Sequence, residues 1–467
     1  MIEGCEDMTS RKVAQSMYRL GVRRSELWDI SNNEESSHTG ISFRPDSLLD
    51  TESMPKSDVQ YHKQTNICKV PLANSHPTIF SFFSGAGFLD LGFESSGFRV
   101  AHVNEYYKPF LEAYHYARQQ LDIARPEYGY HGKSATDFLD GEKKKHLTEL
   151  VEDARKSSNL VGFIGGPPCP DFSIGGKNKG RDGDNGKLSA TYIEIICQQK
   201  PDFFLFENVK GLWKTNKHRE FYEEIKKKTQ DYYFTTNALL NAIEYGVPQD
   251  RERIILLGFR RDLVASRLDK PTRAFDFPWK KHAQYAGEDI FSHPWPSTNR
   301  FEEDSIIPCA QDIIQELTVE HWFRQNNVSN HPNSEQFFQP RAALPRFASI
   351  YEGDDSKKSF KRLHRWRYSP TAAYGHNEVH LHPYKIRRIS VAEALAIQSL
   401  PGDFFLPPSM TLTDAFKATG NGVPFLMARA VAQTILEFLG VVDDKSYRIQ
   451  YYSSDTTFTQ EPSLPIH

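Results

Sequence analysis

Several features that define common protein classes are missing from this chain of 467 residues. Its five cysteines are odd in number and widely spread, so the sequence shows neither a disulfide framework nor a zinc-binding spacing. The first residues lack the basic start and apolar core of an export signal, and no apolar run approaches the length of a membrane span. We therefore expect a soluble, intracellular (cytoplasmic) protein with no metal site and no membrane segment.

A strong overall charge is also missing. With 57 basic and 60 acidic side chains the formal net charge is only −3, which neither supports nor excludes a polyanionic partner. Any nucleic-acid surface must therefore be a local basic face. Most lysine-rich stretches are simply solvated, although the Arg/Trp/His mixture of 361–367 is harder to dismiss. The candidate basic segments are residues 177–181, 280–281, 361–367 and 385–388.

The first 75 residues differ in composition from the rest. One amphipathic helix is predicted from Ser10 to about Ile30, and a polar stretch through Asn66 is typical of a linker. We interpret residues 1–75 as an N-terminal extension with a docking helix. A helix-turn-helix reader is the open alternative for this segment.

From Thr78 to Arg260, apolar runs alternate with helical segments, a pattern typical of an α/β fold with a doubly wound, mostly parallel sheet. Helices are expected from Leu89, from Leu111 to Gln120 and from Glu220 to Lys227. The predicted strands are Thr78 to Phe83, Phe98 to Val103, Leu160 to Ile164, Phe203 to Phe206, and Ile254 to Phe259.

Beyond about Arg261 this alternation stops, and Pro-, Trp- and Phe-rich sequence with little periodicity continues to about Pro383. Helical periodicity returns at Ser390 to Gln398 and at Val423 to Phe438. We expect residues 384–440 to pack back on the sheet. Residues 441–467 are expected to form a tail.

Cys169 stands in Gly-Gly-Pro-Pro-Cys-Pro, directly after the strand predicted at Leu160 to Ile164. The carboxyl ends of strands are where open α/β sheets bind ligands. Prolines fix φ and lack an N–H group, so they make a stiff support for a nucleophile. Taken alone, a cysteine near a strand end is more often a packed small hydrophobe than a nucleophile.

Two further strands have chemically useful residues at their ends. Glu207 follows the run Phe203 to Phe206, and Arg251 and Arg253 precede the run Ile254 to Phe259. A thiol, a carboxylate and guanidinium groups at one sheet edge are the groups needed for attack on an electron-poor ring. The alternatives without a catalytic role are that Glu207 caps a helix and that the two arginines form surface salt bridges.

A glycine-rich turn follows the first predicted strand. Phe83-x-Gly85-x-Gly87 lets the backbone approach a ligand closely, and Glu105 ends the next strand, where a carboxylate can accept two ribose hydroxyls. The third glycine of a dinucleotide motif is replaced by Asp90, which favours S-adenosylmethionine over NAD. Without the glycine-rich turn before it, Glu105 would be interpreted as an ordinary charged residue on the surface.

Taken together, these motifs resemble the C5-cytosine DNA methyltransferases, in particular those of bacterial restriction-modification systems. The resemblance runs from about Pro77 to Leu439 in the family's motif order and is specific as an ordered set. Its blocks are Phe83-Ser84-Gly85-Ala86-Gly87, Asn104-Glu105, Pro167-Pro168-Cys169, Glu207-Asn208-Val209, Gln249-x-Arg251-x-Arg253, Arg388 to Pro401, and Gly420 to Pro424.

The resemblance implies a Rossmann-like catalytic domain at 76–260 with a target-recognition domain inserted at 261–383. It also implies S-adenosyl-L-methionine as cofactor, S-adenosyl-L-homocysteine as product, and double-stranded DNA as substrate. Cys169 would add to C6 of a flipped-out cytosine. Glu207 would stabilise the ring, Arg253 would hold O2, and Arg251 would orient the loop or a phosphate. The implied cofactor-binding residues are Phe83, Gly85, Ala86, Gly87, Glu105, Tyr106, Asp137, Pro168, Asn421 and Val423.

Three departures from the family pattern are visible. Ser81 and Phe88 stand where the family often has Asp and Gly, so we expect a rearranged methionine end of the pocket. Pro170 replaces a common Gln, which puts one contact of that Gln in doubt. The basic Gly-rich segment Ser173 to Lys187 could close over the site or be a flexible linker.

Alternatives remain open on the sequence alone. A transfer-RNA cytosine methyltransferase uses the same chemistry, but the Cys-Phe-Thr signature usual in that branch is missing. A catalytically idle DNA-binding regulator is disfavoured by the intact Cys169, Glu207 and Arg253, and NAD-linked catalysis by Asp90. We expect a monomeric enzyme, with a cognate restriction endonuclease as a possible partner.

Overall fold

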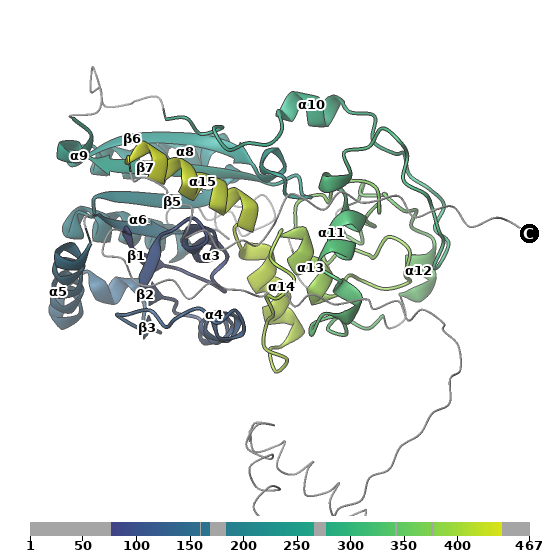
Figure 1. The fold of residues 1–467 in the computed structure, drawn as a ribbon, viewed down its shortest axis with the longest axis horizontal. Helices are drawn as coiled ribbons and strands as arrows, with labels where there is room; N and C mark the ends of the chain where they lie inside the picture. The colour runs from purple at the N-terminus through teal and green to yellow at the C-terminus, as the bar shows by residue number, and fades with distance from the viewer. Residues whose placement is uncertain are drawn as a thin grey trace, which may run out of the picture. The chain divides into compact units, whose positions relative to one another are not determined.

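The structure is a computed structural model of the full chain (Figure 1). It describes residues 76–158, 160–168, 184–265, 277–340, 343–357, 359–372, 374 and 378–440. The predicted helix Ser10 to Ile30, the linker after it, and the tail 441–467 lie outside these ranges. Every described residue belongs to one compact unit.

The described residues form a seven-stranded sheet in the order β3-β2-β1-β4-β5-β7-β6. The pairs from β3 through β5 are parallel, whereas β7 lies antiparallel to both β5 and β6. This confirms the α/β fold with a doubly wound, mostly parallel, Rossmann-like sheet. The strands are β1 (Thr78–Phe82), β2 (Arg99–Asn104), β3 (Tyr130–His131), β4 (Val161–Gly165), β5 (Phe203–Val209), β6 (Tyr233–Asn241) and β7 (Glu252–Arg260).

Helices cover both faces of the sheet. All five residues of β1 and of β4 are buried, as expected for central parallel strands whose two faces are both covered. Neighbouring residues face opposite sides, so Ile79 belongs to one apolar cluster and Phe80 to the other. Helices α3 (Phe88–Glu94), α4 (Lys108–Gln120) and α15 (Phe425–Phe438) cover the first side; α5 (Gly141–Ser157), α6 (Asp184–Gln199) and α8 (Asn216–Thr229) cover the second.

The predicted strands all exist, but their ends differ by a few residues. The largest shift is in β5, which continues through Glu207 to Val209 because it stays paired with β7 up to Val209 and Arg253. Two strands were not predicted. Tyr130–His131 is too short to show a period, and Tyr233–Asn241 carries threonines and asparagines that hide its apolar positions.

The part of the chain after β7 contains short elements beside the sheet (Figure 1). A capping box between Ser390 and Glu393 starts α13, where helical periodicity was predicted to return. No described helix is both long enough and apolar enough to cross a bilayer. The remaining helices are α7 (Lys210–Lys214), α9 (Arg261–Ala265), α10 (Gly287–Ser292), α11 (Val319–Gln325), α12 (Leu344–Ala348), α13 (Val391–Ile397) and α14 (Leu412–Asn421).

Candidate active site

A cavity of about 1060 Å³ lies at the carboxyl ends of the parallel strands, the edge where open α/β sheets bind ligands. The strand order sets the order of its lining residues. Glu105 follows β2, Ser81 lies in β1, Pro168 follows β4, and Glu207 lies in β5. Segments far along the chain complete the wall with Phe338, Thr371, Ala372, Tyr374, Lys417, Asn421 and Val423.

The loop between β1 and α3 has two glycines with different tasks. Gly85 has φ +57°, and nothing lies within 4 Å of the position of a Cβ there, so the space beside it is open. Gly87 has φ +86°, and a Cβ there would lie 2.5 Å from Nη1 of Arg118. Phe83, Gly85 and Ala86 line the cavity, whereas Gly87 shapes the loop from behind.

Glu105 is held in place by the backbone around it. Its Oε2 accepts from the N–H of Gly85 at 2.9 Å, and its Oε1 accepts from the N–H of Tyr107 at 2.7 Å. The side chain is buried, and burial raises the pKa of the carboxyl although these two N–H groups favour its charged form. Tyr106 lines the cavity next to it and is 72% exposed, so its ring is available to a ligand.

Asp137 is, besides Gly87, a predicted cofactor residue that the structure does not bring to the cavity wall. It lies in the 3₁₀ turn η1 (Ala135–Phe138) and forms an ion pair with Lys143. From the same loop, Ser134 and Ala135 line the cavity instead.

The loop after β4 brings the predicted nucleophile region close to Glu207. A Cβ on Gly166 would lie 2.8 Å from Oε2 of Glu207, so a larger residue there would require this carboxylate to shift. Nδ2 of Asn208 donates to the carbonyl of Pro167 at 3.3 Å. Pro168 lines the cavity, and Cys169 and Pro170, which follow it, lie outside the described residues.

Glu207 forms a buried ion pair with Arg253. Nε of Arg253 lies 2.9 Å from Oε1 of Glu207, and both residues line the cavity. Burial raises the pKa of Glu207, and the two arginines nearby oppose that rise only in part. The helix-capping alternative does not apply, because α7 begins after Val209 with no side-chain cap.

Arg251 is fully buried and does not line the cavity. Its guanidinium donates to the carbonyls of Ala372 at 2.8 Å, Gly420 at 2.6 Å and Gly422 at 3.0 Å. Of the two roles considered for this arginine, the geometry therefore favours orienting a loop over binding a phosphate.

The segment from Gly420 to Val423 forms part of the cavity wall. A Cβ on Gly422 would lie 2.2 Å from the ring of Phe88, so this glycine allows close packing between segments far apart in the sequence. Phe88, the residue that departs from the family pattern, also packs edge-on against Phe404. The departure thus fills the space between the first loop and the C-terminal segment.

Sequence reasoning missed several charged residues of the wall, among them Lys417 and Asp90. Lys417 lies on α14, with its Nζ 5.0 Å from the centre of the Tyr107 ring and close enough to Glu105 to favour that carboxylate's charged form. Asp90 was noted only as the replacement for a motif glycine. No periodicity or motif marks Lys417, whereas the position of Asp90 directly after the glycine turn was an available signal.

A lysine pair lies at the rim near Glu207. Lys210 and Lys214 on α7 contact the carboxylate of Glu252 at 2.5 and 3.3 Å, and together they hold its pKa below the usual value. Lys210 and Glu252 both line the cavity. Two ammonium groups against one carboxylate leave a net positive rim.

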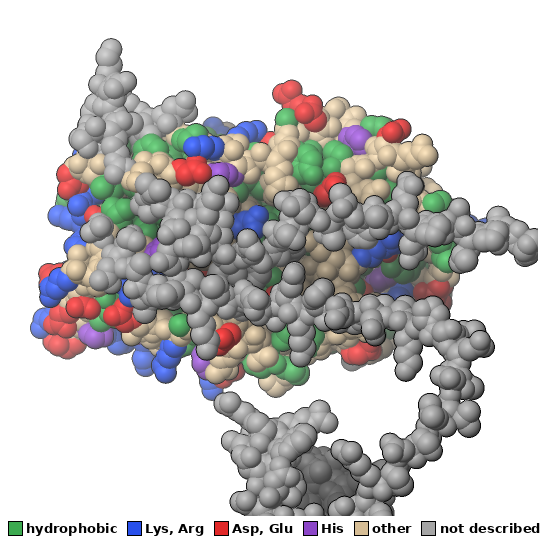
Figure 2. Space-filling model, viewed as in Figure 1, with side chains coloured by type: hydrophobic (Ala, Val, Ile, Leu, Met, Phe, Trp, Pro, Cys, Tyr) green, Lys and Arg blue, Asp and Glu red, His purple; other side chains and the backbone are tan. Residues whose placement is uncertain are grey.

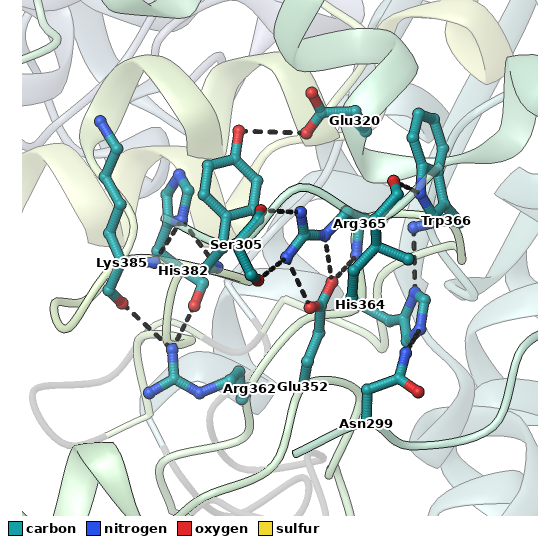
Figure 3. A network of polar contacts seen from close by, with 12 residues as sticks. Asn299, Ser305, Glu320, Glu352, Arg362, His364, Arg365, Trp366, His382 and Lys385 are labelled. Atoms are coloured by element: carbon teal, nitrogen blue, oxygen red, sulfur yellow. Dashed lines mark hydrogen bonds and ion pairs between the residues drawn. The ribbon is translucent and has the colours of Figure 1, made fainter. Parts of the chain in front are cut away.

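The strongest predicted basic segment, 361–367, proves to be largely interior. Arg365 donates to both carboxylate oxygens of Glu352 at 2.8 Å and to Ser305, and Arg362 donates to the carbonyls of His382 and Lys385 (Figure 3). Both arginines and Trp366 are buried. The expectation that Arg362 and Arg365 present a basic face was wrong, because their charges are used to hold loops together.

The other predicted basic segments do not form one continuous face. Lys280 and Lys281 pair with Glu244 and Glu437, and Arg387 pairs with Glu393. Residues 177–181 lie outside the described ranges. In the view of Figure 2, lysine and arginine side chains are interspersed with aspartate and glutamate. Within the described part of the chain, no group of three or more His, Cys, Asp or Glu side chains is arranged to hold a metal ion.

Comparisons with known proteins point to one family. A profile described as C-5 cytosine-specific DNA methylase matches residues 78–437. The Type II methyltransferase M.NmeDI of Neisseria meningitidis serogroup C is 56% identical over 362 residues, which cover 77% of this chain and 84% of that protein. The Type II methyltransferase M.FnuDI of Fusobacterium nucleatum is 30% identical over 369 residues, covering 77% and 94%.

One solved structure supports the fold independently. It is described as a DNA modification methyltransferase encoded within a prophage (E. coli), and it matches with a TM-score of 0.52 at 21% identity, covering 78% of this chain and 99% of that one. The profile match spans every lining residue of the cavity. The chain belongs to the C-5 cytosine-specific DNA methylase family and is a DNA cytosine-5-methyltransferase.

Proposed function

We propose that the cavity holds S-adenosyl-L-methionine together with a cytosine extruded from double-stranded DNA, and that methylation of C5 proceeds through a covalent bond between Cys169 and C6. One observation carries the proposal. Glu105 and Glu207, the carboxylates predicted for the cofactor and for the base, line a single cavity. Pro168, the neighbour of Cys169, lines it as well.

The residues at the Glu105 end fit an adenosyl group. Each carboxylate oxygen accepts one backbone N–H and keeps a lone pair for a ribose hydroxyl. The exposed ring of Tyr106 can stack on adenine, and the open space at Gly85 permits close approach. Phe83, Ala86, Asn421 and Val423 would enclose the ligand. When bound, S-adenosylmethionine supplies an electrophilic methyl group and leaves as S-adenosylhomocysteine.

The residues at the Glu207 end fit attack on a cytosine ring. C5 of cytosine is a weak nucleophile, so the Cys169 thiolate first adds its electron pair to C6, which moves electron density to C5. Glu207 would hold a proton at N3 as negative charge develops on the ring, and burial favours its protonated form. After C5 has been methylated, its proton leaves and the thiolate departs from C6, which restores the ring.

The two arginines would have different tasks. Arg253, which reaches the cavity from β7, would donate to O2 of the base. Arg251 would act as a positioning residue, because its bonds to Ala372, Gly420 and Gly422 tie β7 to two distant wall segments.

The target base must leave the helix, because C5 and C6 are shielded in duplex DNA. We propose residues 261–383 as the region that selects the target sequence. The positive rim of Lys210 and Lys214 is positioned to bind a DNA phosphate near the extruded nucleotide. We also propose Asp137, which pairs with Lys143 in this structure, as the acceptor for the adenine amino group.

The biological setting is proposed from the relatives. Both curated relatives described above are named Type II methyltransferases, and such a name belongs to a restriction-modification pair. We therefore propose that a cognate endonuclease cuts the same site when it is unmethylated. We propose that the methyltransferase acts as a monomer inside the cell.

A trapping experiment tests the catalytic step. Bisulfite sequencing of DNA from cells expressing the protein identifies the target first. Duplex DNA with 5-fluorocytosine at that target should then form a covalent adduct with the wild-type protein and S-adenosylmethionine, because fluorine cannot leave as a proton does. Denaturing gels and peptide mapping should locate the bond at Cys169.

Cys169→Ser should form no adduct and transfer no methyl group while still binding S-adenosylhomocysteine. Cys197→Ser is the matched control, since Cys197 is a half-buried free thiol on α6 that does not line the cavity. An adduct that persists in Cys169→Ser, or no adduct from wild-type protein on a verified target, would contradict the covalent mechanism.

A further inference from the structure

Asp90 is a fully buried carboxylate in the wall of the cavity. It lies in the first turn of α3, directly after the glycine loop. Its Oδ1 accepts from the hydroxyl of Ser81 at 2.8 Å, and its Oδ2 accepts from the hydroxyl of Tyr114 at 2.8 Å. Both carboxylate oxygens therefore act as acceptors, as they do in an ionised carboxylate.

The positive charge beside Asp90 is shared with a second acid. Arg118 packs 3.7 Å from the centre of the Tyr114 ring, and its Nη2 donates to Oε2 of Glu94 at 2.5 Å. Among the described residues, Arg118 is the one cation that acts on Asp90, and it also acts on Glu94. Two buried carboxylates thus face one guanidinium, and burial raises the pKa of each acid. With both acids ionised, the cluster is one positive charge short.

The sheet order places this cluster at the middle of the cavity edge. Glu105 follows β2 and Glu207 lies in β5, whereas β1, which carries Ser81, lies between them beside β4. A ligand with its ribose at Glu105 and a methyl group directed toward a base at Glu207 must cross β1. In such a ligand the sulfur would lie near the part of the wall that Ser81 and Asp90 form.

We propose that Asp90 makes the cavity selective for a positively charged sulfonium over a neutral thioether. The inference rests on the proposed cofactor. A sulfonium would supply the positive charge that the cluster lacks, whereas the thioether product would not. Asp90 would therefore hold the substrate form of the cofactor more tightly than the product form and assist product release.

Isothermal titration calorimetry of the full chain tests this selectivity. The cationic probe is sinefungin, in which an ammonium-bearing carbon replaces the sulfonium, and the neutral probe is S-adenosylhomocysteine. In Asp90→Asn the Kd for sinefungin should rise about ten-fold or more, because one charge is removed from a low-dielectric wall. The Kd for S-adenosylhomocysteine should change less than about three-fold, because the neutral sulfur does not sense that charge.

Asp153→Asn is the matched control. Asp153 also accepts a tyrosine hydroxyl, from Tyr128 at 3.0 Å, but it lies on α5 and does not line the cavity. The ratio of the two dissociation constants should stay unchanged in this variant. Tyr114→Phe provides a second test if Asp90→Asn does not fold. It removes one donor to Asp90 and keeps the charge, so sinefungin should bind as tightly as before or more tightly.

The outcomes separate the two proposals. Equal weakening of both probes in Asp90→Asn, or loss of sinefungin selectivity in Tyr114→Phe, would overturn the electrostatic role and leave Asp90 as a structural residue. Failure of both probes to bind the wild-type protein would instead contradict the proposed cofactor.

Discussion

Nε of Arg253 lies 2.9 Å from Oε1 of Glu207, and each side chain is 10% exposed. A buried ion pair of this kind is costly to break from one side, because the remaining charge stays in the interior. The pair also places Glu207 between two functions, since the same carboxyl is proposed to hold a proton for the base. Under that proposal, binding of cytosine would redistribute hydrogen bonds that already exist in the free enzyme.

Replacing Glu207 by Gln should lower kcat by about 10²–10⁴-fold, the range typical for loss of a positioned proton donor. The amide cannot transfer a proton to N3. Binding of S-adenosylhomocysteine should be unchanged, because Glu207 lies at the other end of the cavity from Glu105. Single-turnover methylation together with calorimetry would check both statements. A variant with normal kcat would remove Glu207 from the chemistry.

The raised pKa of Glu207 also predicts a pH dependence of stability. An acid whose pKa is higher in the folded state than in the unfolded state stabilises the fold through its protonated form. This contribution is fully present below the pKa of the unfolded state, near 4.5, and is lost as the pH rises through the pKa of the folded state. The wild-type free energy of unfolding should therefore fall, relative to that of Glu207→Gln, from about pH 4.5 upward. Urea unfolding of both proteins at several pH values measures the difference. Parallel curves would contradict the raised pKa.

Glu105→Ala should weaken binding of S-adenosylhomocysteine by roughly ten-fold or more, because two charge-assisted hydrogen bonds of about 1.5–3 kcal/mol each would be lost. Calorimetric titration provides the measurement. Glu127→Gln serves as the control, since Glu127 pairs with Arg99 and does not line the cavity. An unchanged dissociation constant for Glu105→Ala would reduce Glu105 to a loop-holding residue.

Arg365→Met should destabilise the fold by about 3–5 kcal/mol, because it leaves the buried carboxylate of Glu352 without its partner. This outcome differs from that of a DNA-contacting arginine, whose loss would change the salt dependence of binding and spare stability. Urea unfolding separates the two possibilities, with the exposed Lys357→Ala as control. Unchanged stability with a flatter salt slope would restore the basic-face hypothesis.

Gly422→Ala should destabilise the enzyme by about 1–3 kcal/mol, because the new Cβ would meet the Phe88 ring at 2.2 Å. Adding Phe88→Leu should restore part of the loss by making room. A double-mutant cycle of unfolding free energies measures this coupling. Strictly additive effects would show that the contact between these residues does not limit the packing.

The sequence predicted those features of the fold and the site that leave a signal in neighbouring residues of the chain. The positions of Glu105, Glu207 and Pro168 in the cavity wall follow from strand ends, which a short apolar run reveals. Lys417 reaches the same wall from about three hundred residues further along, and nothing near it in the sequence indicates that contact. Long-range packing of irregular segments is not encoded in a local period.

The burial of Arg365 illustrates the same limit for charge. A run of basic residues is normally exposed, and only the three-dimensional pairing with Glu352 and Ser305 makes its burial possible. The sequence pattern at 361–367 predicted exposed basic residues, whereas Arg362 and Arg365 are buried. Conversely, Asp90 was treated as a missing glycine because its partners Ser81 and Tyr114 come from two other elements.

The first and last helices of the described domain pack against each other, and a Cβ on Gly92 of α3 would lie 2.5 Å from the Cβ of Ala428 on α15. While the chain is still being synthesised, two later segments are missing beside the glycine loop. One is α15, which packs on α3, and the other is the segment of Asn421, which lines the cavity. We therefore expect methylation only from polypeptides that extend through α15. Polypeptides terminated before α15 should be inactive rather than partly active.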